Sequence, residues 1–335
     1  MFQSLMQALC RASYARPSTL PGREFRRVAD KLRDLISRRY DPVVNATING
    51  FPLKVRASNS MPGRFASGFY DELPADRLLK LIGKPDAVVV DVGANIGYTA
   101  LFAHAVCPNA TFILIEGDPY AFDLLEQNTR TIANRTLHHV VLGEADGTIE
   151  GEFVHMTGTA SFVAHGVLGA NHRLEPFQPR KVENRQATLD TLLAGVDRVD
   201  LVKIDTDGYE AKVMTGARET FRRHRCPVFS EFNPSAMIFK GLEPNPIRLF
   251  ELFSECGYAH FCFYDQKGHM LLSVDYRREP QIISDLISYC ACAHIVMDFA
   301  AFHAEDAERF AAFVDAERLR ERQEFDRYVR TYGWK

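Results

Sequence analysis

Five short apolar runs, each separated from the next by enough chain for a helix, constrain the fold of this sequence most strongly. They cover residues 87–92, 111–116, 138–142, 200–205 and 227–232 and are rich in Val, Ile and Leu. Strands of this kind are typical of a parallel sheet, because helices cover both of its faces. Residues 98–106 and 119–132 have the length and composition of crossover helices. The pattern therefore predicts a doubly wound α/β core.

The chain after the fifth run predicts a sheet edge and a tail. A helix is expected at residues 246–256, and residues 259–264 and 269–274 predict an antiparallel hairpin at the edge of the sheet. Residues 303–328 predict a long charged helix with one apolar face. We interpret this helix as one that packs across the domain or forms a homodimer contact.

The chain before the first run predicts smaller elements. Residues 1–40 predict amphipathic helices, Asn49-Gly50 predicts a hairpin turn, and residues 76–82 predict a helix that Gly83 ends. We divide the chain into three parts: an N-terminal helical and hairpin extension at 1–67, a main domain at 68–300 and a C-terminal helix at 301–335.

The composition argues against several classes of protein. The net charge of −3 gives no reason to expect nucleic acid or an anionic membrane as a partner, and the basic cluster at residues 23–31 is interpreted as a solvated face. No transmembrane segment is expected, because no stretch approaches the ~20 apolar residues of a membrane span. We also find no secretory signal. Seven cysteines without a C-x-x-C pair indicate reduced thiols rather than a zinc site, so we expect a cytoplasmic protein.

Each of the five runs ends at, or just before, a carboxylate. The acids are Asp91, Glu116, Glu144, Asp205 and Glu231. One acid at a strand end often caps the next helix, but the same residue type at all five ends is harder to explain in that way. Ligands of open parallel sheets bind beyond the carboxyl ends of the strands. We therefore expect an acidic binding site at this edge.

A glycine turn indicates the class of ligand. Gly93 and Gly97 bracket the turn after the first strand, and Glu116 follows at the distance where a carboxylate can bind a ribose. Asn95 stands where a dinucleotide-binding loop has its middle glycine, and a ring of acids would repel a pyrophosphate. These features favour S-adenosylmethionine, which carries an ammonium and a sulfonium, over NAD.

The segment around the fourth strand predicts a reactive centre. Lys203 and Asp205 share one face of the strand, ~7 Å apart, and a lysine in a covered strand needs a partner. Lys203 therefore either pairs with a neighbouring acid for structural reasons or belongs to the reaction centre. Asp207 is the predicted N-cap of the next helix, with Glu210 as its capping-box partner.

Several of these segments together resemble the FkbM-type methyltransferase family. They are residues 68–72 (GFYDE), 90–98 (VDVGANIGY), 115–119 (IEGDP), 203–210 (KIDTDGYE) and 230–232 (SEF). The resemblance implies a class I methyltransferase fold, which is a Rossmann-like, doubly wound, mostly parallel sheet, here with an antiparallel C-terminal hairpin. It also implies S-adenosylmethionine as donor and O-methylation of a hydroxyl on a sugar, polysaccharide or secondary metabolite. Asp207 and Tyr209 depart from the family pattern, which usually has Glu and a small residue there.

The resemblance also implies site residues. The expected cofactor-binding residues are Asp91, Gly93, Ala94, Asn95, Gly97, Glu116, Gly117, Asp118 and Glu144. Among them the glycine turn would line the methionine end, Glu116 would hold the ribose, and Glu144 would lie near the adenine. Asp205 would stand at the methyl group.

A hydroxyl acceptor is a poor nucleophile while it is protonated, so a general base is expected. Asp205 is the first candidate, with Lys203 orienting it, and Glu231 is the second; His155 and His165 rank below them. No metal ligand is assigned: Asp205, Asp207 and Glu231 would suit magnesium, but their spacing does not require it. The alternatives are an NAD(P)-dependent oxidoreductase and a non-catalytic binding protein of the same fold. The acceptor would be a small molecule or a glycan, and residues 152–185 with the N-terminal extension would select it.

Overall fold

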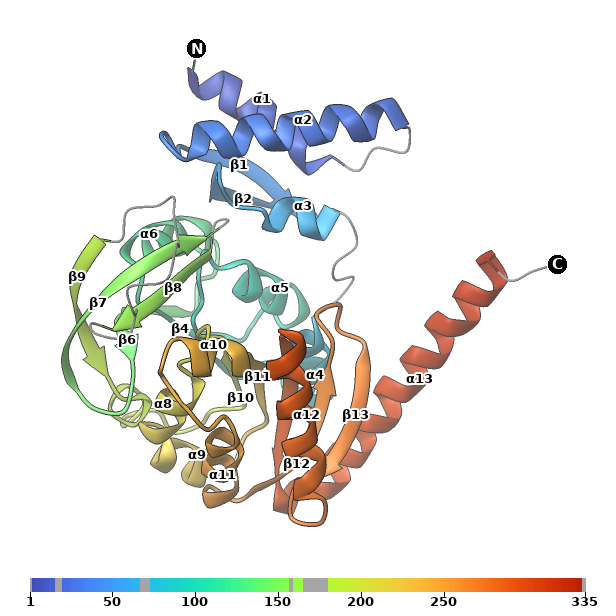
Figure 1. Ribbon diagram of the computed structural model, residues 1–335. Coiled ribbons are helices and arrows are strands. Elements are labelled where there is room, and N and C mark those ends of the chain that lie inside the picture. Colours follow the sequence, from blue (N-terminus) through green and yellow to red (C-terminus); the bar gives the residue numbers. More distant parts are fainter. Residues whose placement is uncertain (1, 16–19, 67–72, 157–158, 165–179, 333–335) are drawn as a thin grey trace.

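The computed structural model describes residues 2–15, 20–66, 73–156, 159–164 and 180–332, and its centre is an eight-stranded sheet (Figure 1). The strand order is β13-β12-β14-β11-β10-β3-β4-β5. Five strands are parallel neighbours: β3 (Val88–Val92), β4 (Thr111–Glu116), β5 (Arg135–His139), β10 (Leu201–Ile204) and β11 (Val228–Phe232). This arrangement confirms the predicted doubly wound, mostly parallel sheet.

The far edge of the sheet is antiparallel. The predicted hairpin is present as β12 (Tyr258–Tyr264) and β13 (Met270–Asp275), at the sheet edge. A strand that the sequence analysis did not predict, β14 (Met297–His303), lies between β11 and β12 and is antiparallel to both. The hairpin is therefore joined to the parallel strands through the last strand of the chain.

Helices cover both faces of the sheet and bury separate apolar clusters. One cluster holds side chains of α4 (Pro74–Ile82), α5 (Tyr98–Val106), α6 (Pro119–Asn128) and α13 (Ala307–Tyr332). The other holds side chains of α8 (Glu210–Thr215), α9 (Arg218–His224), α10 (Pro234–Phe239), α11 (Ile247–Glu255) and α12 (Pro280–Ala293), with α7 (Leu189–Leu192). No helix among the described residues is both long and apolar enough to cross a membrane.

A second, smaller sheet lies beside the carboxyl ends of β4 and β5. Its strands are β6 (Val141–Leu142), β9 (Arg180–Ala187), β7 (Gly147–Met156) and β8 (Thr159–Ala164), in that order. The predicted third strand at 138–142 is thus divided between two sheets, and a region expected to be mainly loop contains strands. Strand β9 reads RKVENRQA, and so polar a sequence gives no apolar periodicity to detect.

The N-terminal residues form a module at one end of the molecule (Figure 1). It comprises α1 (Phe2–Tyr14), α2 (Leu20–Ser37), the hairpin β1 (Val43–Ile48) and β2 (Phe51–Arg56), and α3 (Met61–Ala66). The hairpin turn is the predicted one, since Asn49 and Gly50 both have positive φ. Side chains of this module share one apolar cluster with the helices of the main domain. The boundaries near residues 67 and 300 stay predictions; β14 runs across the second of them.

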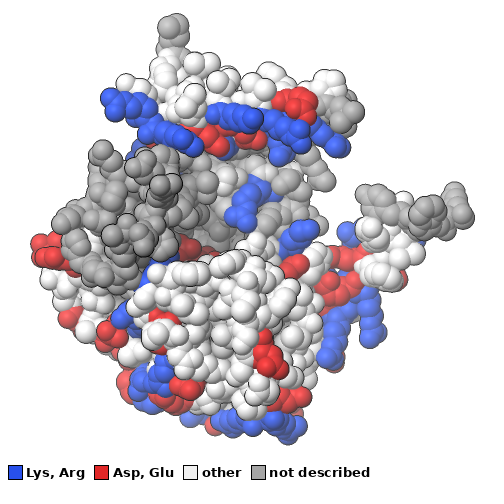
Figure 2. Space-filling view, viewed as in Figure 1, with Lys and Arg blue, Asp and Glu red and all other residues white. Residues whose placement is uncertain are grey.

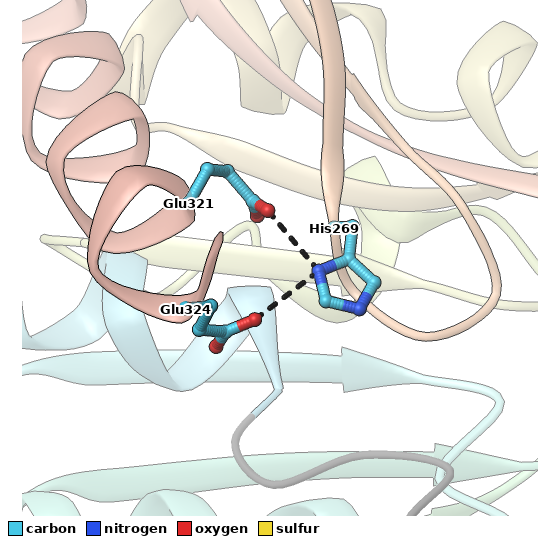
Figure 3. Close-up of side chains that lie close together, drawn as sticks. All are labelled: His269, Glu321 and Glu324. Atoms are coloured by element: carbon cyan, nitrogen blue, oxygen red, sulfur yellow. Dashed lines mark hydrogen bonds and ion pairs between the residues drawn. The ribbon is translucent and has the colours of Figure 1, made fainter. Parts of the chain in front are cut away.

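Charged side chains attach α13 to the body of the molecule. Arg77 of α4 donates to both carboxylate oxygens of Glu317, at 2.7 and 2.8 Å, and both side chains are buried. One turn further, His269 Nδ1 lies 3.1 Å from Glu321 and 3.3 Å from Glu324 (Figure 3). The last turns of the helix extend away from the body and expose Phe325 and Tyr328, so the predicted homodimer contact through α13 stays a prediction (Figure 1).

His269, Glu321 and Glu324 are the one group of three among the described residues with the spacing of metal ligands. Arg320 already donates to both carboxylates, 2.5 Å from Glu324 Oε1 in one case. A metal ion there would meet a guanidinium that neutralises its ligands. We therefore interpret the group as part of the helix attachment.

Removing the Glu317 carboxylate tests this attachment. We expect Glu317→Ala to lower the free energy of unfolding by about 3–5 kcal/mol, because it removes a buried carboxylate that pairs with the buried Arg77. Urea unfolding measures the change. Asp315→Ala is the matched control on the same helix, since Asp315 is exposed and lies 3.9 Å from an exposed Arg318; its effect should stay within about 0.5 kcal/mol. Equal effects of the two substitutions would contradict the assigned role.

Candidate active site

A cavity of about 380 Å³ opens at the carboxyl ends of β3, β4, β10 and β11. Six of the residues predicted to bind the cofactor line it: Asp91, Gly93, Ala94, Asn95, Glu116 and Gly117. The three predicted catalytic residues, Lys203, Asp205 and Glu231, line it as well. Four of the five acids that the sequence analysis placed at this edge, Asp91, Glu116, Asp205 and Glu231, therefore line one cavity.

Three predicted cofactor residues lie outside the lining of this cavity. Asp118 caps α6 and accepts hydrogen bonds from the backbone N–H groups of Tyr120 and Ala121. Gly97 precedes α5, and a Cβ there would lie 2.6 Å from Thr129 Cγ2, so it permits close helix packing. Glu144 is exposed and pairs with Lys212 at 3.4 Å. Their contacts therefore show a helix cap for Asp118, a helix-packing position for Gly97 and a surface ion pair for Glu144.

The turn after β3 brings two strand ends into close contact. Gly93 has a φ of 73°, and a Cβ at this position would lie 1.9 Å from the carbonyl oxygen of Asp205. Only glycine fits there. Asn95 also has a positive φ, of 49°, which Asn tolerates better than most residues. The turn thus presents backbone rather than side chains to the cavity.

Lys203 joins these strand ends electrostatically. Its Nζ lies 3.0 Å from Asp91 Oδ1 and 3.4 Å from Asp205 Oδ2, and it donates to the carbonyl of Gly93 at 2.9 Å. Burial disfavours the charged amine, but the carboxylates of Asp91 and Asp205 outweigh it and raise the pKa of Lys203. The predicted pairing of Lys203 with neighbouring acids is present, and Lys203 also lines the cavity; its place in a reaction centre stays a prediction.

Glu116 lies at the end of β4 with both carboxylate oxygens engaged by backbone. Oε2 accepts from the N–H of Asn95 and Oε1 from the N–H of Asp118, each at 2.8 Å. Burial raises the pKa of Glu116 to about 7, although these two N–H groups act in the opposite direction. A carboxylate oxygen can accept more than one hydrogen bond, so a ligand can still donate to it.

Asp205 and Glu231 differ in their surroundings. The Asp205 side chain is 39% exposed and lies beside Lys203. Glu231 stands opposite Asp298 in the pairing of β11 with β14, and its buried Oε2 has no hydrogen-bond partner among the described residues. Burial first, and then the charges of Asp205 and Asp207, raise the pKa of Glu231 well above its usual value. The two acids therefore stand in different electrostatic surroundings, Asp205 beside a cation and Glu231 among other acids.

The loop after β10 corrects the predicted capping box. The N-cap of α8 is Tyr209, and Asp207 has a left-handed φ of 53°. Glu210 still reaches back, accepting from the N–H groups of Thr206 and Gly208, so half of the predicted motif is present. Asp205, Asp207 and Glu231 do not form a group with the spacing of metal ligands within the described part of the chain.

Other residues of the cavity wall were missed by the sequence analysis. Asn59, Met61 and Arg64 come from the N-terminal module, Gln266 from the β12–β13 turn, and Asp298 from β14. Short helices and turns carry no sequence signal of this kind. The apolar run that contains Asp298 could have indicated a strand. The side chains of His155 and His165 lie outside the described residues.

Comparison with known proteins agrees with this geometry. A family model described as the methyltransferase FkbM domain matches residues 91–259. The 2-O-methyltransferase NoeI of Sinorhizobium fredii is 26% identical over 165 residues, which cover 47% of this chain and 68% of the relative. The 31-O-demethyl-FK506 methyltransferase FkbM of Streptomyces tacrolimicus is 29% identical over 181 residues, covering 46% and 69%.

A solved structure, the methyltransferase FkbM of Methylobacillus flagellatus, aligns over 76% of this chain and 53% of its own, with 14% identity and a TM-score of 0.36. In the present structure, β14 lies antiparallel between β11 and β12 beside the parallel strands, which is the class I methyltransferase arrangement. The family match covers half of the 335 residues and includes Asp91, Glu116, Asp205 and Glu231. The chain is therefore a methyltransferase and belongs to the FkbM family.

Proposed function

We propose that this protein is an S-adenosylmethionine-dependent O-methyltransferase that acts on a hydroxyl of a sugar, polysaccharide or secondary metabolite. The observation that carries the proposal is the buried Lys203, which pairs with Asp205 in the lining of a cavity that Glu116 also lines. The printed names of two relatives, one a 2-O-methyltransferase and one a 31-O-demethyl-FK506 methyltransferase, support an oxygen acceptor.

The residues of the cavity fit an adenosyl cofactor. Glu116 would accept hydrogen bonds from the ribose hydroxyls, and the backbone of the Gly93–Asn95 turn would contact the methionine end. Val141 and Phe153 give the wall beside Gly117 an apolar surface suited to adenine. Asp91 and Asp205 lend the site negative charge, which favours the ammonium and the sulfonium.

In the proposed mechanism the protein aligns the reactants and moves one proton. When bound, S-adenosylmethionine supplies a methyl group that is already activated for transfer. Asp205 accepts the proton of the acceptor hydroxyl, and Lys203 orients this carboxylate. Glu231, in the protonated form that burial favours, would donate a hydrogen bond to the acceptor instead of acting as the base. No step in this proposal requires a metal ion.

Membership of a methyltransferase family removes the oxidoreductase alternative. The remaining alternative is a binding protein that keeps the fold without turnover. The intact Lys203, Asp91 and Asp205 contacts favour an enzyme, because a buried lysine is costly to retain. Formation of S-adenosylhomocysteine with a panel of sugars distinguishes the two.

The state of Glu116 predicts how cofactor binding depends on pH. Ribose hydroxyls donate to the ionised carboxylate, so binding should be constant above about pH 8 and weaken as the pH falls through 7, by up to about tenfold per unit. Calorimetric titration with S-adenosylhomocysteine measures this dependence. Glu116→Gln should bind more weakly at pH 8 and lose that part of the pH dependence. Parallel pH profiles of the two proteins would contradict the assignment.

Replacing the proposed base separates chemistry from binding. Asp205→Asn should keep its affinity for S-adenosylhomocysteine within about twofold and lose about 10²–10⁴-fold in turnover. Asp207→Asn removes the same charge two residues away and should cost less than about tenfold. Methyl transfer to an acceptor found in the sugar panel is the measurement. Unchanged turnover in Asp205→Asn removes it from the role, and equal losses would assign the effect to cavity charge alone.

A further inference from the structure

Four large apolar residues of α2 lie on its solvent side. Phe25, Val28, Leu32 and Leu35 follow one another at intervals of three, four and three residues, which places them on one helix face. All four are exposed, Phe25 at 67%. The helix is therefore amphipathic with its apolar face turned outward.

Polar contacts fix this orientation. Ala29, Arg33 and Ser37 form the buried face of α2. Arg33 donates to Ser13 of α1 at 2.5 Å and to Asp34 at 2.8 Å, and its guanidinium lies over the ring of Tyr14 at 5.4 Å. A rotation of α2 that buried the apolar face would expose Ala29 and break these contacts with α1. The packing of α2 against α1 thus fixes the outward orientation of its apolar face.

The apolar surface continues beyond α2. The rings of Phe2 and Tyr40 are in contact, with centroids 5.6 Å apart, and Leu5 is exposed on α1. We call the seven residues together the outer apolar face: Phe2, Leu5, Phe25, Val28, Leu32, Leu35 and Tyr40. Their exposed fractions run from 44% to 67%. Gathered apolar side chains of this extent mark an interaction surface.

The segment that carries most of this face has an excess of positive charge. Residues 20–40 contain seven Lys and Arg against three Asp and Glu, whereas the whole chain has a net charge of −3. Figure 2 shows Lys and Arg gathered along the N-terminal helices. Arg27, Lys31 and Arg38 are exposed. The net charge of the whole chain does not reveal this local excess of positive charge. We therefore interpret the basic cluster at residues 23–31 as part of an interaction surface rather than as a solvated face.

We propose that the outer apolar face binds the surface of an anionic lipid membrane, with α2 lying in the plane of the interface. An exposed apolar stripe with basic residues beside it is the pattern of an interfacial helix, in which apolar side chains enter the bilayer and cations meet the headgroups. No described helix can span the membrane, so the contact is peripheral. Pairing of two copies through this face would instead bring their basic residues together.

Vesicle flotation of the full chain tests the proposal. We expect binding to vesicles of equal parts phosphatidylglycerol and phosphatidylcholine, and little binding to phosphatidylcholine alone. Phe25→Glu should weaken binding at least tenfold. Phe325→Glu on α13 is the matched control: Phe325 is 66% exposed and lies outside the outer apolar face, so this variant should bind as the parent does.

A charge-reversal variant tests the electrostatic part of the proposal. Lys31→Glu should weaken binding to the anionic vesicles, and added salt should do the same. Absence of binding, equal binding to both vesicle types, or equal loss in Phe25→Glu and Phe325→Glu would each overturn the proposal. So would a dimer in light scattering that Phe25→Glu dissociates without any vesicle binding. Affinity for S-adenosylhomocysteine, measured on the same samples, reports folding and keeps this outcome separate from that of the proposed function.

Discussion

The ammonium of Lys203, buried between Asp91 and Asp205, is the interaction on which the site depends. An unpaired charge at this depth would cost several kcal/mol, so the ammonium depends on the carboxylates that pair with it. The same nitrogen binds the carbonyl of Gly93, which holds the turn after β3 against the end of β10. The absence of a Cβ at Gly93 follows from this closeness. One cation thus sets both the shape of the cavity and the position of its exposed acid.

The carboxylates of the cavity have different surroundings, and we assign them different roles for this reason. Asp205 is partly exposed beside the ammonium of Lys203. Glu231 is buried near other acids and is paired with Asp298 of the neighbouring strand β14. Two acids in different surroundings are a usual arrangement for acid–base work. Burial raises the pKa of Glu116 to about 7, so its charge changes near physiological pH. The acids predicted at the strand ends therefore differ in their surroundings and in the roles that we propose for them.

The central strands and α5 could be predicted because continuous Val, Ile and Leu runs give a strong signal. Strand β14 gave a weaker signal, since its Phe and Ala run fits a helix as well as a strand, and its place in the sheet could not be predicted because it enters out of chain order. The position of a residue in a motif also does not show what it lies against. Gly93 and Gly97 belong to one turn, yet Gly93 lines the cavity and Gly97 lies against the side chain of Thr129. For α2, amphipathicity was predictable, but the outward direction of its apolar face depends on the contacts of Arg33 with α1.

A crystal structure of the protein with S-adenosylhomocysteine tests the central claim most directly. The account predicts that the ribose hydroxyls lie within hydrogen-bond distance of Glu116, and that the sulfur faces Asp205 while Lys203 keeps both of its acids. A cofactor bound outside this cavity, or one whose ribose contacts neither oxygen of Glu116, would contradict it.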